Sequence, residues 1–184
     1  MVVDTGPCRM RVLNPPGARN TVLTAGKLNN GSALNNRSIV TRLDCGPHSF
    51  LFTADIETST IVRLQHDPWF SARVVKVPHH GGRSSLHEGW IASAPPEVAV
   101  ISVGRVNSYG HPTVQVLDAY ERQSVRMLRT DRDGAIQMVG KLSSPDLTVR
   151  SARGELILPV VFGSTMLAAE QDNLLKLWTQ WTAI

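Results

Sequence analysis

Hydrophobic and polar positions alternate between residues 38 and 54 in a way that predicts two β-strands. The first strand, residues 38–43, carries Ile39, Val40 and Leu43, and the second, residues 49–54, reads SFLFTA. Between the two strands, the sequence DCGP has the residue types that form tight turns. We therefore expect a β-hairpin whose second strand ends at Asp55.

Helical and strand patterns alternate from residue 57 to residue 139. Apolar residues at helical spacing predict a short helix over residues 57–66, which Asp67-Pro68 ends because proline cannot continue a helix. This alternation is typical of an α/β sandwich, with a mixed sheet flanked by helices and with ligands bound beyond the strand ends. Further strands are predicted at residues 73–77, 97–103, 125–129 and 135–139, and further helices at 84–93 and 112–123.

Two segments lie outside this alternation. Residues 17–37 are rich in glycine, asparagine and small polar residues, so we expect a long surface loop that is either functional or disordered. Near the C-terminus we expect a strand at residues 155–162 and an amphipathic helix at residues 166–184, whose leucines and tryptophans are best explained as packing. The chain accordingly divides into a domain at residues 1–142 and a C-terminal extension at residues 143–184.

Composition adds only a weak preference for anionic partners. The 184 residues, 42% of them hydrophobic and 18% charged, are typical of one soluble globular domain, and their net charge of +4 does not by itself identify nucleic acid. Cys8 and Cys45 form no C-x-x-C pair, so we expect two reduced thiols. The sequence shows neither a membrane-spanning apolar run nor a signal peptide, and the chain alone is expected to be soluble.

Side chains suited to acid–base or metal chemistry follow three of the predicted strands. Asp55 ends the hairpin, His79 and His80 end the next strand, and His111 follows a third strand after a short loop. Strands of one sheet can bring such ends together. The sequence lacks the G-x-S-x-G, phosphate-loop and dinucleotide-binding motifs, so metal-assisted hydrolysis is the enzyme class left open.

Each of these residues also has a structural interpretation. Asp55 is equally suited to cap the helix that begins near Glu57. Because neighbouring side chains in an extended segment point to opposite faces, we expect one of His79 and His80 to be a ligand and the other to support it. Lys76 could contact a phosphate, although a solvated lysine is favoured, and His111 binds metal, donates to an anion or only leads into a helix. The remaining histidines are expected to face solvent, namely His48, His66 and His87.

Six segments in order, spread over residues 12–136, carry a family resemblance. They read VLNPP, LNNRSIVTRL, FLFTADIE, VVKVPHHGGRSS, VAVISVGRVNSYGHP and LRTDRDGAI. In sequence and spacing they resemble the C-terminal half of the metallo-β-lactamase-like domain of ComEC-type competence proteins. The resemblance implies part of an αββα sandwich attached to a polytopic membrane channel that takes DNA into a bacterial cell. It also implies a nuclease dependent on a divalent metal, zinc or manganese.

The resemblance also implies roles for individual residues. Asp55 matches a metal-bridging carboxylate, with Ala54 where the family more usually has glycine, and His79 matches a metal ligand for which His80 is the neighbour or substitute. Catalytic roles fall on Asp55, His79 and His111. Substrate contacts are expected from His111, from Lys76 and from Asn36 at the site edge.

One family feature is absent from the sequence. Metallo-β-lactamase folds take their first ligands from an H-x-H-x-D-H cluster, which residues 2–6, VVDTG, do not supply. We therefore expect a fragment with an under-coordinated site that is inactive alone, its partners being DNA and the membrane channel portion of a full-length protein at the bacterial inner membrane. Alternatives are a non-catalytic nucleic-acid-binding remnant and a metallo-hydrolase completed by another chain. Apolar strand faces at FLFTA and VAVISV are expected to be exposed and to promote self-association, unless the C-terminal helix covers them.

Overall fold

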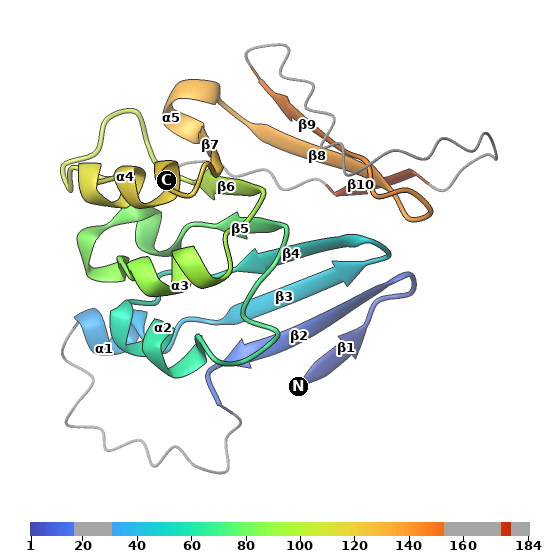
Figure 1. Ribbon diagram of the computed structural model, residues 1–184, viewed down its shortest axis with the longest axis horizontal. Helices are drawn as coiled ribbons and strands as arrows, with labels where there is room; N and C mark the ends of the chain where they lie inside the picture. The colour runs from blue at the N-terminus through green and yellow to red at the C-terminus, as the bar shows by residue number, and fades with distance from the viewer. Residues whose placement is uncertain (17–30, 153–173, 178–184) are drawn as a thin grey trace.

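A mixed seven-stranded sheet forms the centre of the computed structural model, which describes residues 1–16, 31–152 and 174–177 (Figure 1). Its strands lie in chain order, and β1 to β4 pair antiparallel whereas β4 to β7 pair parallel. The hairpin expected from the alternating pattern is confirmed as β3 and β4. The strands are β1 Val2–Asp4, β2 Cys8–Asn14, β3 Val40–Cys45, β4 His48–Phe52, β5 Val74–Lys76, β6 Val98–Ile101 and β7 Arg126–Arg129.

Helices that connect the parallel strands cover one face of this sheet (Figure 1). Parallel neighbours need such crossovers because the end of one strand and the start of the next lie at opposite edges of the sheet. The connecting helices are α2 Thr58–Leu64, α3 Glu88–Ser93 and α4 Val114–Glu121, with shorter turns at α1 Gly31–Asn35, η3 Pro78–Gly81, η4 Arg83–Ser85 and α5 Thr130–Asp133. Their buried side chains, among them Ile61, Trp90 and Tyr120, pack on Leu51, Val75 and Ile101 of the sheet.

A second, three-stranded sheet covers the opposite face. It consists of β8 Ile136–Lys141, β9 Leu147–Ser151 and β10 Leu174–Leu177, in the order β10-β8-β9. Its inward side chains form a second core with strands β4 to β7, containing Phe50, Val74, Val98, Val100, Leu128, Ile136, Met138, Leu147 and Val149. The expectation of exposed apolar strand faces is therefore wrong, because Phe50, Leu51 and all four residues of β6 are buried.

The α/β architecture with a mixed sheet and flanking helices is confirmed. The helix expected over residues 84–93 begins later, at Glu88, because residues 83–85 form the separate turn η4. Near the C-terminus, residues 174–177 form a strand instead of a helix, and the remainder of the expected helix and the strand at residues 155–162 lie outside the described residues. A division at residue 142 stays a prediction, and β8 and β9 pair across it.

Cys8 and Cys45 form a disulfide, so the expectation of two reduced thiols is wrong. The register of β2 and β3 places the two residues directly opposite each other, with their Cα atoms 4.3 Å apart. Their separation of 37 positions in the sequence does not indicate that the two cysteines are paired. Within the described residues, no helix combines the length and hydrophobicity needed to cross a bilayer.

Candidate functional site

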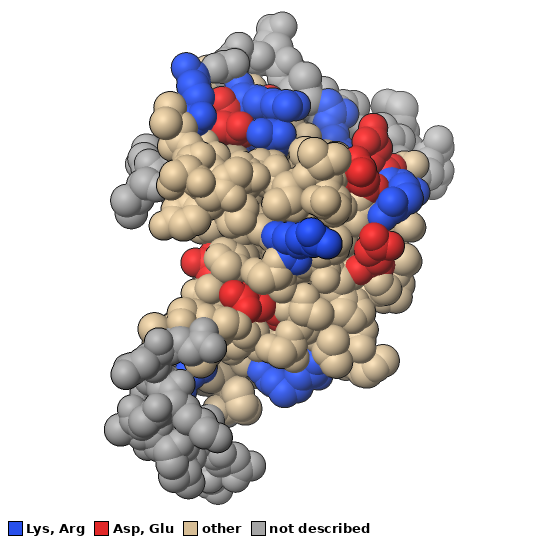
Figure 2. Space-filling model, turned by 90° about the vertical axis from the view of Figure 1, so that its left-hand side faces the viewer, with Lys and Arg blue, Asp and Glu red and all other residues tan. Residues whose placement is uncertain are grey.

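Three loops meet at the edge of the sheet where the parallel strands end. Asp55 follows β4, His79 and His80 follow β5, and His111 lies between β6 and α4. Because β4, β5 and β6 are parallel, their carboxyl ends lie side by side. Figure 2 views the molecule from this side and shows acidic and basic side chains exposed close together in the middle of the face. The convergence that the sequence predicts is thus present.

Asp55 and His80 face each other across this edge. Oδ1 of Asp55 lies 3.4 Å from Nε2 of His80, and both side chains are about two-fifths exposed. Nδ1 of His80 donates to the carbonyl oxygen of Ser102 at 2.6 Å, because a carbonyl can only accept. In the neutral imidazole, Nε2 is then the acceptor. The two side chains are thus close enough to share a bound cation, and the ammonium group of Lys76 also lies 3.8 Å from the same carboxylate oxygen.

The loop after β5 is a left-handed turn, and the sequence does not predict it. His79 and His80 have φ values of 47° and 54°, and Gly81 follows with a φ of 80°. A Cβ atom at Gly81 would lie 2.6 Å from Cβ of Pro112, so only glycine fits there. The argument from an extended segment therefore does not hold for these histidines. The ring centroids of His79 and His80 lie 6.4 Å apart.

His79 contacts a different carboxylate. Its Nδ1 lies 3.6 Å from Oε1 of Glu57 and 3.1 Å from Oγ of Ser84. Of the two histidines that were candidates for a ligand beside Asp55, it is thus His80 that reaches this carboxylate. Glu57 is a site residue that the sequence assigned only to the start of a helix, and its position two residues after Asp55 was the available signal.

Glu57 is held by several donors. Ser32 and Asn35 donate to its carboxylate, and its backbone N–H donates to Oδ1 of Asn36 at 3.0 Å. Burial raises the pKa of Glu57, but these side-chain hydrogen bonds and the charge of His79 outweigh it and lower the pKa overall. Asn36 thus lies next to Glu57, and its side-chain amide also donates to the carbonyl oxygen of Ser32, whereas its contact with a substrate stays a prediction.

Lys76 is buried, so the solvated interpretation is wrong. Its side chain is 8% exposed, and Nζ donates to the carbonyl oxygens of Ala54 at 3.0 Å and Val77 at 3.4 Å. Nζ also lies 3.8 Å from Oδ1 of Asp55. Burial lowers the pKa of Lys76, and the charge of Asp55 partly opposes this. The carbonyl of Ala54 also accepts the backbone N–H of His79, so it links Lys76 to the histidine loop.

His111 is fixed by its backbone while part of its ring lacks a partner. Asn107 accepts the backbone N–H of His111 and donates to its carbonyl oxygen, both at 3.0 Å. Within the described residues, the buried Nδ1 of His111 has no hydrogen-bond partner. Burial, followed by the nearby charges of His79 and His80, lowers the pKa of His111. Its ring centroid is 5.7 Å from that of His79, which brings the third histidine into the cluster.

Two structural interpretations from the sequence are resolved. Asp55 does not cap α2, because Glu57 occupies the N-cap position. His48 does not face solvent but is buried, and its Nε2 donates to the carbonyl oxygen of Lys141 at 2.9 Å. Gly140 provides the space for this ring, since a Cβ there would lie 2.5 Å from Nε2. His66 is exposed as expected, whereas His87 is half-buried and accepts the N–H of Trp90 as the cap of α3.

These residues do not complete a metal centre by themselves. Among the described residues, no group of three or more histidine, cysteine, aspartate or glutamate side chains is arranged to hold a metal ion. Asp55 and His80 supply two donors, and a catalytic zinc site takes about three from protein. The ammonium group of Lys76 also lies against the same carboxylate. The cluster is suited to proton transfer and anion contact, and to a metal only with further donors.

The sequence is similar to part of several longer proteins, although no protein-family model matches it. It is 39% identical over 104 residues to ComE operon protein 3 of Bacillus subtilis strain 168, which covers 56% of this chain and 13% of that protein. It is 32% identical over 105 residues to competence protein ComA of Neisseria gonorrhoeae, covering 56% of this chain and 15% of that protein. Protein YcaI of Escherichia coli K12 is 32% identical over 127 residues, 68% of this chain and 16% of that protein. The chain thus matches only a short segment, 13% to 16%, of each of these longer proteins, one of which is named a competence protein.

Proposed function

We propose that this homologue of ComE operon protein 3 and ComA acts in DNA uptake, as a segment that carries part of a metal-dependent phosphodiesterase site and is inactive alone. The similarity to a protein named for competence, ComA, supports the process. We further propose DNA as its ligand and the membrane channel portion of a longer competence protein as its partner. Zinc or manganese is the metal we propose.

The single observation that supports the chemistry is the facing pair of acceptors, Oδ1 of Asp55 and Nε2 of His80, 3.4 Å apart. A divalent cation is bound by the same two donor types, carboxylate oxygen and neutral imidazole nitrogen. Because two donors are too few, the proposal requires at least one more from a segment or chain outside the described residues. The histidine fixed by Ser102 is oriented as metal-binding imidazoles are, with its other nitrogen donating to a carbonyl.

The neighbouring residues then have roles around the phosphodiester. His111 is neutral at physiological pH because burial and its neighbours lower its pKa, so it can accept a proton there. His79, between Glu57 and Ser84, is placed to hold or move a second proton. Lys76 fixes the Ala54 carbonyl and so orients Asp55. Asn36 holds the backbone of Glu57 at the site edge.

A second candidate function is nucleic-acid binding without catalysis. The contact between Lys76 and Asp55 favours it, because a buried ammonium already balances the carboxylate without any metal. In that case the histidines serve structure and weak backbone contacts with nucleic acid.

Calorimetric titration with Zn²⁺, and in parallel with Mn²⁺, separates the two candidates. The proposal predicts one weak site in the wild-type chain, whose affinity falls at least about tenfold in Asp55→Asn and in His80→Ala because each removes one of two donors. The exposed His66 provides the control, and His66→Ala should bind as the wild type does. Equal affinity in all four proteins would overturn the proposed site, and an absence of any binding would favour the second candidate.

A further inference from the structure

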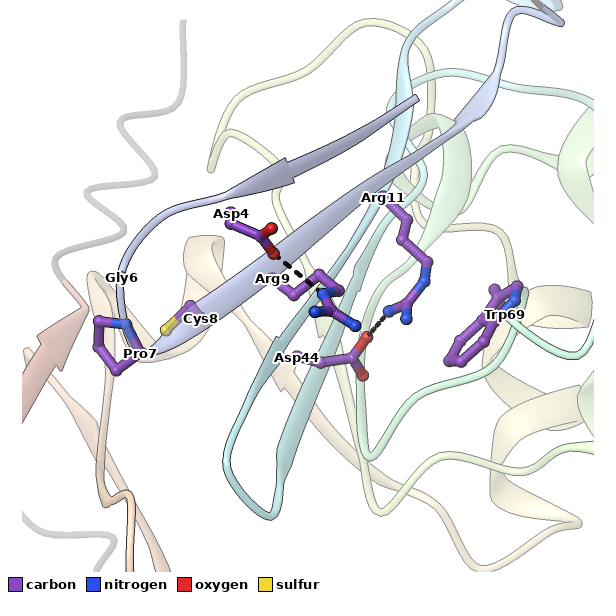
Figure 3. Close-up of a pocket in the computed structure, with 8 residues that line it drawn as sticks. All are labelled: Asp4, Gly6, Pro7, Cys8, Arg9, Arg11, Asp44 and Trp69. Atoms are coloured by element: carbon purple, nitrogen blue, oxygen red, sulfur yellow. Dashed lines mark hydrogen bonds and ion pairs between the residues drawn. The ribbon is translucent and has the colours of Figure 1, made fainter.

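A pocket of about 400 Å³ lies on the helix-side face of β2 and β3 (Figure 3). Trp69 at its edge precedes the amino end of β5, whereas His79 and His80 follow the carboxyl end of that strand. The pocket is lined by side chains that alternate along the strands and so share one face. Arg9 and Arg11 come from β2, and Asp44 comes from β3.

Two arginines meet across the strands beside this pocket. Arg11 and Arg42 are directly opposite in the pairing of β2 and β3, an arrangement in which like charges destabilise a sheet. Asp44 accepts from Nη1 of Arg11 at 2.6 Å and from Nε of Arg42 at 2.8 Å. One carboxylate therefore balances two guanidinium groups, and both arginine side chains are only about one-sixth exposed. The pocket also holds the ion pair of Arg9 with Asp4, so three arginines face two carboxylates and one positive charge remains for an anionic ligand.

An exposed aromatic ring stands next to the guanidinium groups. Cζ of Arg11 lies 3.6 Å from the ring centroid of Trp69, and Trp69 is 41% exposed although it is large and apolar. Within the part of the chain that the structure describes, Arg11 donates a side-chain hydrogen bond only through Nη1, to Asp44. Arg11 therefore keeps further donors for a ligand. Its guanidinium already covers one face of the Trp69 ring, so a base would stack on the opposite face.

We propose that this pocket binds one nucleotide unit of a single-stranded nucleic acid, with the phosphate contacted by Arg11 and the base stacked on Trp69. Phosphate accepts hydrogen bonds from arginine, and base–aromatic stacking is a general means of holding single strands. The pocket volume lies within the range of small-ligand sites. That the strand is DNA rests on the function proposed above, whereas the anion and stacking chemistry does not.

Binding of a labelled oligodeoxythymidylate of about 12 nucleotides, measured by fluorescence anisotropy on the full chain, tests this inference. Trp69→Ala is expected to weaken binding roughly tenfold or more, and Trp69→Phe to keep part of the affinity because it retains a ring. Arg11→Gln should weaken binding and lower the salt dependence by about one phosphate contact. Arg122→Gln is the matched control, since Arg122 is 56% exposed in an ion pair with Glu88 and lies in α4's C-terminal turn.

The inference would be overturned if Trp69→Ala and Arg11→Gln both bound the oligonucleotide with the affinity of the wild type and of Arg122→Gln. Displacement of the oligonucleotide by an acidic peptide at the same concentration would also overturn it, because the site would then bind anions without stacking a base. If Asp55→Asn loses zinc binding but still binds the oligonucleotide, the nucleotide pocket is independent of the metal site. The failure of the pocket and the failure of the phosphodiesterase proposal are therefore distinguishable.

Discussion

Single residues with unusual backbone conformations shape the histidine cluster. Ala54, His79 and His80 all have φ values between 47° and 54°, a left-handed region that costs energy for residues with a side chain. The carbonyl of Ala54 accepts from Nζ of Lys76 and from the backbone of His79, and these contacts hold the turn. The same contacts keep Asp55 directed toward His80.

Replacing Ala54 with glycine should stabilise the protein. Glycine adopts a φ of 48° without a steric penalty, so we expect the free energy of unfolding to rise by about 0.5–1 kcal/mol in Ala54→Gly. Urea denaturation measures this change. Ala92→Gly, at an exposed position of α3, is the control and should lower stability by a similar amount. A loss of stability in Ala54→Gly would contradict the left-handed assignment.

His111 should make the protein sensitive to mild acid. Its pKa is lowered from 6.5 by burial and by His79 and His80, so the unfolded chain binds a proton there more readily than the folded chain. Stability is therefore full above pH 6.5 and falls as the pH drops through the lowered pKa. His111→Gln should flatten this part of the pH dependence of unfolding, and His66→Gln should not. An unchanged slope in His111→Gln would contradict the burial of its Nδ1.

At the scale of elements, the disulfide fixes the pairing of β2 and β3. It closes a loop of 37 positions, so removing it should lower the free energy of unfolding by about 2–4 kcal/mol. The double variant Cys8→Ser/Cys45→Ser and the reduced wild type should unfold at the same denaturant concentration, below that of the oxidised protein. Two titratable thiols in the protein purified without reductant would show that the bond does not form.

Strand β9 should tolerate change on one face only. Leu147 and Val149 are buried in the second core, whereas Arg150, the next residue after Val149, is exposed. Leu147→Ala should lower the free energy of unfolding by about 2–5 kcal/mol through the cavity it leaves. Arg150→Ala should change it by less than about 0.5 kcal/mol. Similar effects of both substitutions, measured by thermal unfolding, would argue against the second sheet as a cover for β4 to β7.

For the whole molecule, local sequence patterns predict individual strands, turns and helices. The hairpin of β3 and β4 and the helices α2 and α4 follow from alternation, turn residues and proline positions. Long-range pairing does not have a local signal. The covering of β6 by β8 and β9, the contact between Cys8 and Cys45, and the burial of His48 under Lys141 all depend on register between distant segments.

The candidate site was predictable in its location but not in its contacts. Strand ends identify Asp55, the adjacent histidines and His111 as neighbours. The left-handed turn, which directs His80 to Asp55 and His79 to Glu57, has no signal in the pair of histidines itself. The burial of Lys76 was also hidden, because a charged residue between apolar ones in a strand reads as solvent-facing when the second sheet is not known.

Complementation of DNA cleavage tests most directly whether the cluster is one part of a phosphodiesterase site. The chain is mixed with Mn²⁺ and with a second polypeptide that carries a histidine and aspartate cluster of the H-x-H-x-D-H type and that co-elutes with the chain. Hydrolysis of single-stranded DNA by the mixture is then followed. We expect no cleavage by either component alone, cleavage by the mixture, and its loss in Asp55→Asn. Cleavage by the mixture that is unaffected by Asp55→Asn and His80→Ala would contradict a shared metal site at these two residues.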